Sequence, residues 1–304
     1  MHRPTTVAVI LLVLGVSVGT AQNLTPTAEL AKRGLGPDDF PRITELAENV
    51  YAYEDVHLQG EITTNSLFVV TEDGVLVADG QGRTDQVERM LAEIGQITDQ
   101  PVRYVVTGSN HGDHTGGNGA FPPRATFVVH PTAQAALDRA EAPVTLSTEV
   151  VSDRLELNMG GTQIQILHLG RAHTGSDLVV YLPVEKVLFM SESYLHRMFP
   201  SLGGGYPTEW IEAIRRAEEM DVDIYVPGHG FVDDAATLNA ELGVFRQALE
   251  TVIAEGTRLH SAGTSAEDAA SQANLGAFAD WSIGEIMAPR AIARVYAELN
   301  GELN

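Results

Sequence analysis

Short apolar runs separated by turns characterise the first part of the chain. Between residues 43 and 79, the runs NVYAY, NSLFVVT and GVLVADG alternate or stay apolar over about five residues, which predicts β-strands. The EDG sequence at 72–74 predicts a hairpin turn. RTDQVERMLAEIGQI then has apolar residues at helical spacing, so we expect a helix whose buried side carries Val87, Met90, Leu91 and Ile94.

The same alternation of strands and helices continues to the end of the chain. VRYVVTG and RATFVVH predict strands, and TAQAALDRA predicts a helix. TQIQILHLG, DLVVYLP, KVLFMS and DIYVPGHG predict further strands, and PTEWIEAIRRAEEM predicts a helix. From about residue 233 to 304 the pattern is mostly helical, and TSAEDAA at 264–270 is a helix start signal. One compact α/β domain is the simplest interpretation.

The composition indicates an acidic globular protein. The 304 residues include 41 Asp and Glu against 19 Lys and Arg, a formal net charge of -22. Such a surface repels nucleic acid and anionic membranes, so we expect neither as a partner and expect a small-molecule substrate instead. The chain has no cysteine, so any metal ion must be held by His, Asp, Glu or neutral oxygen ligands.

The N-terminus has the pattern of a secretory signal peptide. A short cationic start, MHRP, precedes the apolar run VAVILLVLGVSVG, and GTAQ supplies small residues for cleavage after Ala21. The apolar run is too short to cross a bilayer, which takes about 20 residues. We therefore expect residues 1–21 to be removed, and residues 22–304 to form a single domain with a helical C-terminal extension in the periplasm or secreted from the cell.

Polar side chains with metal-binding chemistry gather at four places where an apolar strand gives way to small residues. They are His111, Asp113 and His114 within TGSNHGDHTGGN, followed by His173, Glu192 and His229. Side chains at strand ends can converge at one edge of a sheet, and glycine lets the backbone approach a bound ion. Imidazole and carboxylate are normal zinc ligands, and a hydrolytic site keeps one position for water. The pattern therefore predicts a zinc site.

These four stretches resemble the motifs of the metallo-β-lactamase superfamily. The family's hallmark reads H-x-H-x-D-H, often followed by G-G-N, and residues 109–118 here read S-N-H-G-D-H-T-G-G-N. GRAHTGSD, VLFMSE and PGHG are similar to the family's later motifs, in the same order and at similar spacing. The resemblance spans roughly residues 43–232. It implies a four-layered αβ/βα sandwich with the metal ions at one edge, between the two sheets.

The resemblance also implies a role for each residue of the motifs. His111 and His173 correspond to ligands of a first zinc ion. Asp113, His114 and His229 correspond to ligands of a second zinc ion, and Asp113 would also orient the attacking water.

Two positions depart from the family pattern, so the number of Zn²⁺ ions, one or two, stays open. Ser109 stands where the first ion's third histidine is expected, and Glu192 stands where the family has a bridging aspartate or, in some members, a cysteine. Ser109 could coordinate through a water or its hydroxyl, with weaker binding of the first ion. Alternatively Asn110, His196 or His57 takes the vacated place, or the site is no longer catalytic. Glu192 could be a ligand or could support one.

Two classes of function remain. In the first, the protein is an exported zinc-dependent hydrolase in which metal-bound hydroxide attacks a carbonyl. A β-lactam is then the first expected substrate, with a role in antibiotic resistance, and a lactone, thioester or sulfate ester is the alternative for the same fold. In the second class, the protein is a metal-binding periplasmic accessory protein with little turnover. Asp113 favours the first class, because a site that only binds metal does not require a water-orienting carboxylate.

Overall fold

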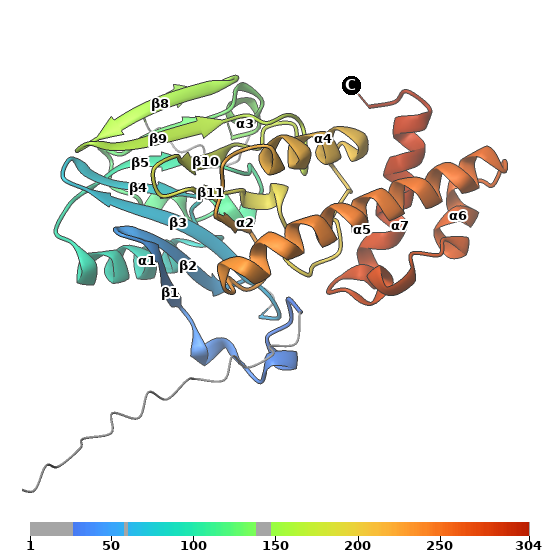
Figure 1. Ribbon diagram of the computed structural model, residues 1–304, viewed down its shortest axis with the longest axis horizontal. Helices are drawn as coiled ribbons and strands as arrows, with labels where there is room; N and C mark the ends of the chain where they lie inside the picture. The colour runs from blue at the N-terminus through green and yellow to red at the C-terminus, as the bar shows by residue number, and fades with distance from the viewer. Residues whose placement is uncertain (1–26, 58–59, 138–146, 304) are drawn as a thin grey trace, which may run out of the picture.

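Two β-sheets packed face to face form the centre of the molecule (Figure 1). The computed structural model describes residues 27–57, 60–137 and 147–303, so the expected signal peptide at 1–21 lies outside the described residues. Along the described parts of the chain, no helix is both long enough and apolar enough to cross a membrane.

The first sheet has seven strands in the order of the sequence. They are β1 (Arg42–Ala47), β2 (Val50–Val56), β3 (Thr63–Thr71), β4 (Gly74–Ala78), β5 (Val102–Val106), β6 (Thr126–Val129) and β7 (Ser147–Val150). Strands β1 to β4 are antiparallel neighbours, whereas β4 to β7 are parallel. The turn between β3 and β4 is the hairpin turn that EDG predicts, with Thr71 paired to Gly74.

The second sheet has five strands, in the order β12, β11, β10, β9, β8. They are β8 (Arg154–Met159), β9 (Thr162–Leu167), β10 (Val179–Leu182), β11 (Val187–Phe189) and β12 (Ile224–Val226). Only the pair β11 and β12 is parallel. The facing sides of the two sheets bury a shared apolar core that includes Leu67, Val106, Ile166, Val180 and Phe189.

Helices cover the outer faces of both sheets. Helix α1 (Thr84–Ile97) packs on the first sheet through Val87, Met90 and Ile94, as its apolar spacing predicts. Helices α4 (Pro207–Glu218) and α5 (Ala235–Ser261) cover the outer face of the second sheet, and α7 (Gly284–Leu299) packs against them farther from the strands (Figure 1). The order helix, sheet, sheet, helix is the predicted four-layered sandwich, and the fold class is confirmed.

The C-terminal part is helical, as predicted. Ser265 caps α6 (Ala266–Gln272) by accepting a hydrogen bond from the Asp268 N–H. Helices α5 and α7 approach closely at Gly256, where an added Cβ would lie 2.7 Å from Val295. The remaining helices, α2 (Gly112–Thr115) and α3 (Pro131–Leu137), are short.

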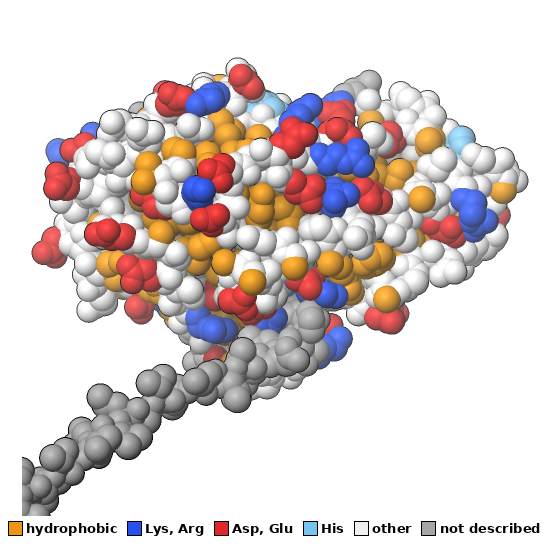
Figure 2. Space-filling view, in the orientation of Figure 1, with side chains coloured by type: hydrophobic (Ala, Val, Ile, Leu, Met, Phe, Trp, Pro, Cys, Tyr) orange, Lys and Arg blue, Asp and Glu red, His pale blue; other side chains and the backbone are white. Residues whose placement is uncertain are grey.

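Charged side chains are distributed over the surface without forming one large patch on the face shown in Figure 2. Acidic and basic groups are interspersed there, and apolar side chains show between them. The excess of acidic residues is therefore spread out rather than gathered into a single docking surface on that face.

Candidate metal centre

The predicted site residues come together at one edge of the two sheets. Strands β4 and β5 are parallel neighbours, as are β11 and β12, so the loops that follow each pair emerge at the same edge. The loop after β5 carries residues 109–114, and the loop between β9 and β10 carries His173. Glu192 and His229 follow β11 and β12. All of the predicted metal-binding side chains lie in one cluster, in two groups that share Glu192.

The first of these groups, the inner group, consists of Asp113, His114 and His229. The Nε2 atoms of His114 and His229 lie 3.1 Å apart. Oδ2 of Asp113 is 3.2 Å from the Nε2 of His229 and 3.7 Å from that of His114. Both histidines are buried, whereas Asp113 is partly buried.

Each histidine of the inner group is oriented through its other ring nitrogen. Nδ1 of His114 lies 3.0 Å from Oδ2 of Asp79, and Nδ1 of His229 lies 2.7 Å from the Thr63 carbonyl oxygen. A carboxylate and a carbonyl are acceptors only, so each neutral ring carries its hydrogen on Nδ1. If both rings were neutral, their Nε2 lone pairs would face each other at 3.1 Å, so either a proton on one ring or a bound cation must lie between them.

The second group, the outer group, consists of His111 and His173. Nδ1 of His111 lies 3.1 Å from Nε2 of His173. His173 is buried and its ring contacts Trp210 edge to face, with centroids 5.2 Å apart, whereas 43% of the His111 side chain is exposed. Nδ1 of His173 is buried and has no hydrogen-bond partner among the described residues.

Glu192 lies between the two groups. Its Oε2 is 2.8 Å from Nδ1 of His111 and accepts a hydrogen bond from the Ser109 hydroxyl. Its Oε1 is 3.0 Å from Nε2 of His173 and 3.3 Å from Nε2 of His229. One carboxylate therefore touches both groups: Oε2 lies against the outer group, and Oε1 lies between the two.

The donor atoms are spaced as ligands of a common ion are spaced. Two ligands about 2.0 to 2.1 Å from one zinc ion in tetrahedral geometry lie about 3.3 Å apart. The nitrogen and oxygen contacts of His229 with its three neighbours in the cluster are 3.1, 3.2 and 3.3 Å. The imidazole and carboxylate donors also match the chemistry that zinc prefers, so the residues present fit a metal ion.

The charges of the metal-free cluster explain its protonation. Burial alone would raise the pKa values of Asp113 and Glu192, yet the neighbouring histidines hold both pKa values well below the usual range. Burial opposes a charge on His229 and His111, but their bonds to the carboxylates raise the pKa of His229 to about 10 and that of His111 to about 9. Both carboxylates are thus ionised at neutral pH, as metal ligands must be.

Asp79 is a functional candidate that the sequence analysis did not identify. It follows the buried strand β4, is itself fully buried, and has a left-handed backbone with φ of 57°. Its Oδ1 accepts hydrogen bonds from the backbone of Gly108 and Ser109, so the same carboxylate holds the loop after β5 and orients His114. Strained backbone of this kind is concentrated at functional sites. The sequence feature that could have identified Asp79 is an aspartate directly before a glycine, at the end of an apolar strand.

The residues considered as substitutes for the missing histidine lie elsewhere. Nε2 of His57 is 3.4 Å from Oδ2 of Asp113, beside the inner group and not the outer one. His196 is buried outside both groups, with Nδ1 hydrogen-bonded to the Phe231 carbonyl. Glu192 is the side chain that meets Ser109, and the sequence analysis had considered it only for the bridging position.

A loop held by the C-terminal extension lies beside His173. The backbone N–H of Tyr206 donates to the Ala172 carbonyl, next to His173. The Arg294 guanidinium from α7 donates to the carbonyls of Gly204 and Gly205 at 3.1 and 2.6 Å.

Two residues farther along the chain, the same attachment continues at the start of α4. The Glu298 carboxylate accepts from the backbone N–H and the hydroxyl of Thr208, at 3.1 and 2.8 Å. Helix α7 therefore fixes residues 204–208, which link the metal-binding edge to α4.

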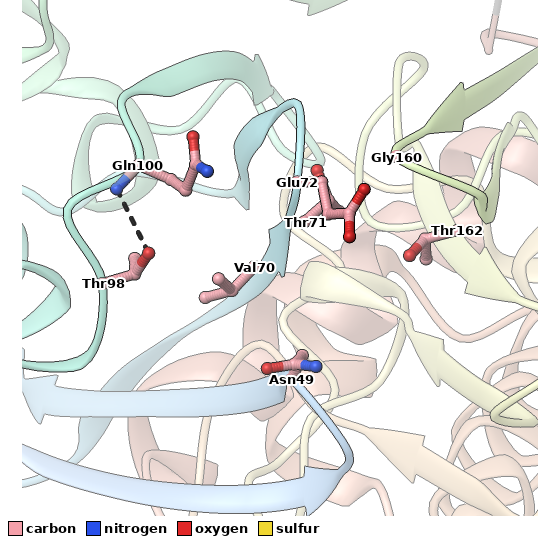
Figure 3. Close-up of a pocket in the computed structure, with 8 residues that line it drawn as sticks. All are labelled: Asn49, Val70, Thr71, Glu72, Thr98, Gln100, Gly160 and Thr162. Carbon is pink, nitrogen blue, oxygen red and sulfur yellow. Dashed lines mark hydrogen bonds between the residues drawn. The ribbon is translucent and has the colours of Figure 1, made fainter.

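A surface pocket at the other end of β3 has different chemistry. Its volume is about 410 Å³, and Figure 3 shows its lining side chains. These are neutral polar groups, one valine and one carboxylate: Asn49, Val70, Thr71, Glu72, Thr98, Gln100, Gly160 and Thr162. Thr98 already accepts a hydrogen bond from the Gln100 N–H (Figure 3). The pocket contains no histidine and none of the predicted site residues.

Comparisons with known sequences agree with this geometry. The family model of the metallo-beta-lactamase superfamily matches residues 60–229, more than half of the chain. Metallo-beta-lactamase type 2 of Bacteroides fragilis is 24% identical over 216 residues, which cover 68% of this chain and 86% of that enzyme. The 2,4-dinitroanisole O-demethylase subunit alpha of Nocardioides sp. (strain JS1661) is 27% identical over 174 residues, which cover 54% of this chain. The chain matches only about half, 52%, of that subunit's length.

Solved structures share the fold. A metallo-beta-lactamase from Pontibacter korlensis has a TM-score of 0.59 at 21% identity, covering 68% of this chain and 99% of its own. A double mutant of the sec-alkyl sulfatase PisA1 has a TM-score of 0.66 at 14% identity, covering 87% of this chain and 51% of its own.

Proposed function

We propose that the protein, which belongs to the metallo-β-lactamase superfamily, is a metal-dependent hydrolase whose centre is the cluster of His111, Asp113, His114, His173, Glu192 and His229. The observation that carries the proposal is the pair of facing Nε2 atoms of His114 and His229, 3.1 Å apart and next to two ionised carboxylates. Zinc is the metal that best fits these ligands. When bound, zinc lowers the pKa of a water molecule and polarises the group under attack.

The protein's own residues supply the geometry of the reaction. Asp113 is the carboxylate of the inner group that keeps some exposure to solvent, so it can accept a hydrogen bond from the attacking water and take its proton. His57, whose Nε2 lies 3.4 Å from Oδ2 of that carboxylate, helps to hold it in place. In hydrolysis of an amide, the water oxygen then adds to the carbonyl carbon, the C–N bond breaks, and the proton passes to the leaving nitrogen.

We take a β-lactam as the first candidate substrate. Support comes from the similarity to the B. fragilis enzyme, which extends over 86% of that lactamase. The signal-peptide pattern of residues 1–21 adds support, because an exported hydrolase meets β-lactams outside the cytoplasm. An exported protein should have Gln22 at its N-terminus after maturation, and N-terminal sequencing of the protein from the periplasm or medium tests that expectation.

A sulfate ester is the second candidate. The observation that favours it is the extent of the structural match, since the sulfatase covers 87% of this chain whereas the Pontibacter lactamase covers 68%. Residues outside the lactamase-like part can bear on this choice, because α7 fixes residues 204–208 beside the proposed centre. For this substrate the S–O or C–O bond of the ester breaks and water supplies the new oxygen.

The test is a zinc titration of chelator-stripped protein with two chromogenic substrates, a cephalosporin and an aryl sulfate, together with a secondary alkyl sulfate. Cephalosporin hydrolysis that rises with zinc supports the first candidate, and sulfate release that rises with zinc supports the second. The Asp113→Ala variant serves as the control for catalysis at this centre. Tight zinc binding without hydrolysis of any ester, lactone, thioester or lactam would contradict the proposal and favour an accessory metal-binding protein.

A further inference from the structure

We propose that Ser109 and Glu192 together replace the histidine that the first metal site lacks, with Glu192 binding both ions and Ser109 positioning its carboxylate. This inference rests on the proposed function, because it concerns the ligands of the same two ions. It assigns Oε2 of Glu192 to the outer ion and Oε1, which lies between His173 and His229, to the inner ion. It also makes Ser109 a positioning residue rather than a vacant ligand position.

The first step of the argument is the place of Glu192. It is the member common to both candidate ligand groups, and its two oxygens point in different directions. Oε2 lies 2.8 Å from the exposed His111, and Oε1 lies 3.0 Å from His173 and 3.3 Å from His229. An outer group with two histidines alone would offer too few ligands, and Oε2 of Glu192 supplies the third.

The second step is the direction of the Ser109 hydrogen bond. The His111 backbone N–H donates to Ser109 Oγ at 3.2 Å, so a lone pair of that oxygen is already engaged. The hydroxyl hydrogen is therefore free to point to Oε2 of Glu192, with which it bonds. A ligand carboxylate is commonly held by such an outer hydrogen bond, and its loss costs about 10- to 100-fold in metal affinity.

The third step is the complementary size of the two side chains. Ser109 is fully buried, and its loop is crowded, since a Cβ on neighbouring Gly108 would lie 2.7 Å from Ser191. The side chain of Glu192 is one methylene longer than the aspartate that the family has at this position. The extra length brings its carboxylate to the hydroxyl of the small Ser109 side chain. An imidazole at position 109 would have to displace the carboxylate of Glu192 from its bond to that position. The two departures from the family motif are thus one coupled change.

The experiment measures zinc binding directly, by competition with a fluorescent chelator and by the absorption spectrum of the Co²⁺-substituted protein. Glu192→Gln should weaken both ions, whereas His173→Ala should weaken one ion and His114→Ala the other. Ser109→Ala should lower the affinity of the outer ion about 10- to 100-fold. Ser109→Thr, which keeps the hydroxyl, should retain most of it. Ser282→Ala is the matched control, because it removes a buried serine hydroxyl that bonds to Glu29 instead.

A double-variant cycle tests the coupling. Ser109→His and Glu192→Asp should each weaken the outer ion, and the double variant should recover the affinity because it restores the family's ligand pair. Ser109→His that tightens the outer ion without any change at position 192 would overturn the proposal, since it would mean that the place was empty. Unchanged binding in both Ser109→Ala and Glu192→Gln would also overturn it.

The outcomes separate this inference from the proposed function. Coupled zinc binding as described, without hydrolysis of any substrate, supports the ligand assignment and contradicts the hydrolase. Zinc-dependent hydrolysis with no effect of Glu192→Gln on either ion supports the hydrolase and overturns the ligand assignment.

Discussion

The inner and outer groups of the cluster use the same kinds of side chain but differ in how firmly they are held. His114 and His229 of the inner group are buried, and each has an oxygen close to its second ring nitrogen: the Asp79 carboxylate lies 3.0 Å from Nδ1 of His114, and the Thr63 carbonyl lies 2.7 Å from Nδ1 of His229. In the outer group, 43% of the His111 side chain is exposed and Nδ1 of His173 has no partner among the described residues.

From this difference we expect the two proposed metal sites to be unequal. A ligand whose orientation is fixed before binding loses little freedom when the ion arrives, and its fixed tautomer presents the lone pair. The inner group meets both conditions. The outer group has only two histidines and needs the Glu192 carboxylate as its third ligand. We therefore expect the inner ion to bind tightly and the outer ion to bind more weakly.

The largest effect is expected at Asp113. Asp113→Ala removes an oxygen of the inner group and the carboxylate proposed to orient water, so turnover should fall by at least about 100-fold. Circular dichroism should remain that of the unaltered protein, because Asp113 lies in the short helix α2, is partly exposed and does not belong to the core. Turnover that stays unchanged at saturating zinc would remove Asp113 from the mechanism.

A paired substitution tests the inequality of the two groups. His114→Ala should remove the tight ion, because it deletes a buried, preoriented ligand, and His111→Ala should remove only the weaker one. Metal content after dialysis against a chelator measures the difference. Equal losses in the two variants would contradict the distinction between the groups.

A smaller effect is expected from the residue that orients His114. Asp79→Asn leaves the size unchanged but weakens the acceptor for Nδ1 of His114, so the affinity of the inner ion should fall about 10- to 100-fold. Asp55→Asn is the control, because Asp55 is equally buried but pairs with Arg89 away from the cluster. A similar loss of affinity in both variants would show that Asp79 acts only through general stability.

The dependence of zinc binding on pH should be gradual. In the metal-free protein the pKa of His111 is about 9 and that of His229 about 10, so zinc must displace protons at neutral pH and its affinity should rise towards pH 9 to 10. Because both pKa values are raised in the fold, the two histidines add to the stability of the metal-free protein. This contribution is complete below about pH 6.5, the usual histidine pKa, and is lost as the pH rises through 9 to 10. Calorimetry in buffers of different ionisation enthalpy measures the proton release, and its absence at pH 7 would contradict these assignments.

The sequence predicted the fold class and the four stretches of the cluster because these depend on local patterns. Apolar periodicity predicted α1 and most strands, and polar residues after strand ends predicted which side chains meet. Strands β7 and β8 were not predicted, since β8 (RLELNM) has charged residues on its exposed side and only partly buried apolar ones along most of its length. An edge strand of this kind depends on its partner, here β9, more than on its own composition.

The details of the centre could not be predicted, because they depend on contacts between distant segments. The sharing of Glu192 between two groups arises from the meeting of loops that follow β5, β9, β11 and β12. The orientation of His229 comes from a backbone carbonyl, Thr63, which any residue type would provide. The role of Asp79 follows from its contact with a histidine 35 positions farther along the chain.

The attachment of residues 204–208 to α7 has a consequence for the order in which the protein is made. Arg294 and Glu298, which hold this loop, are about 90 positions farther along the chain than the groups they bind. A ribosome releases the ligand-bearing loops, including His229, well before it releases α7. The chain therefore emerges with every residue of the cluster before the helix that holds residues 204–208 beside His173.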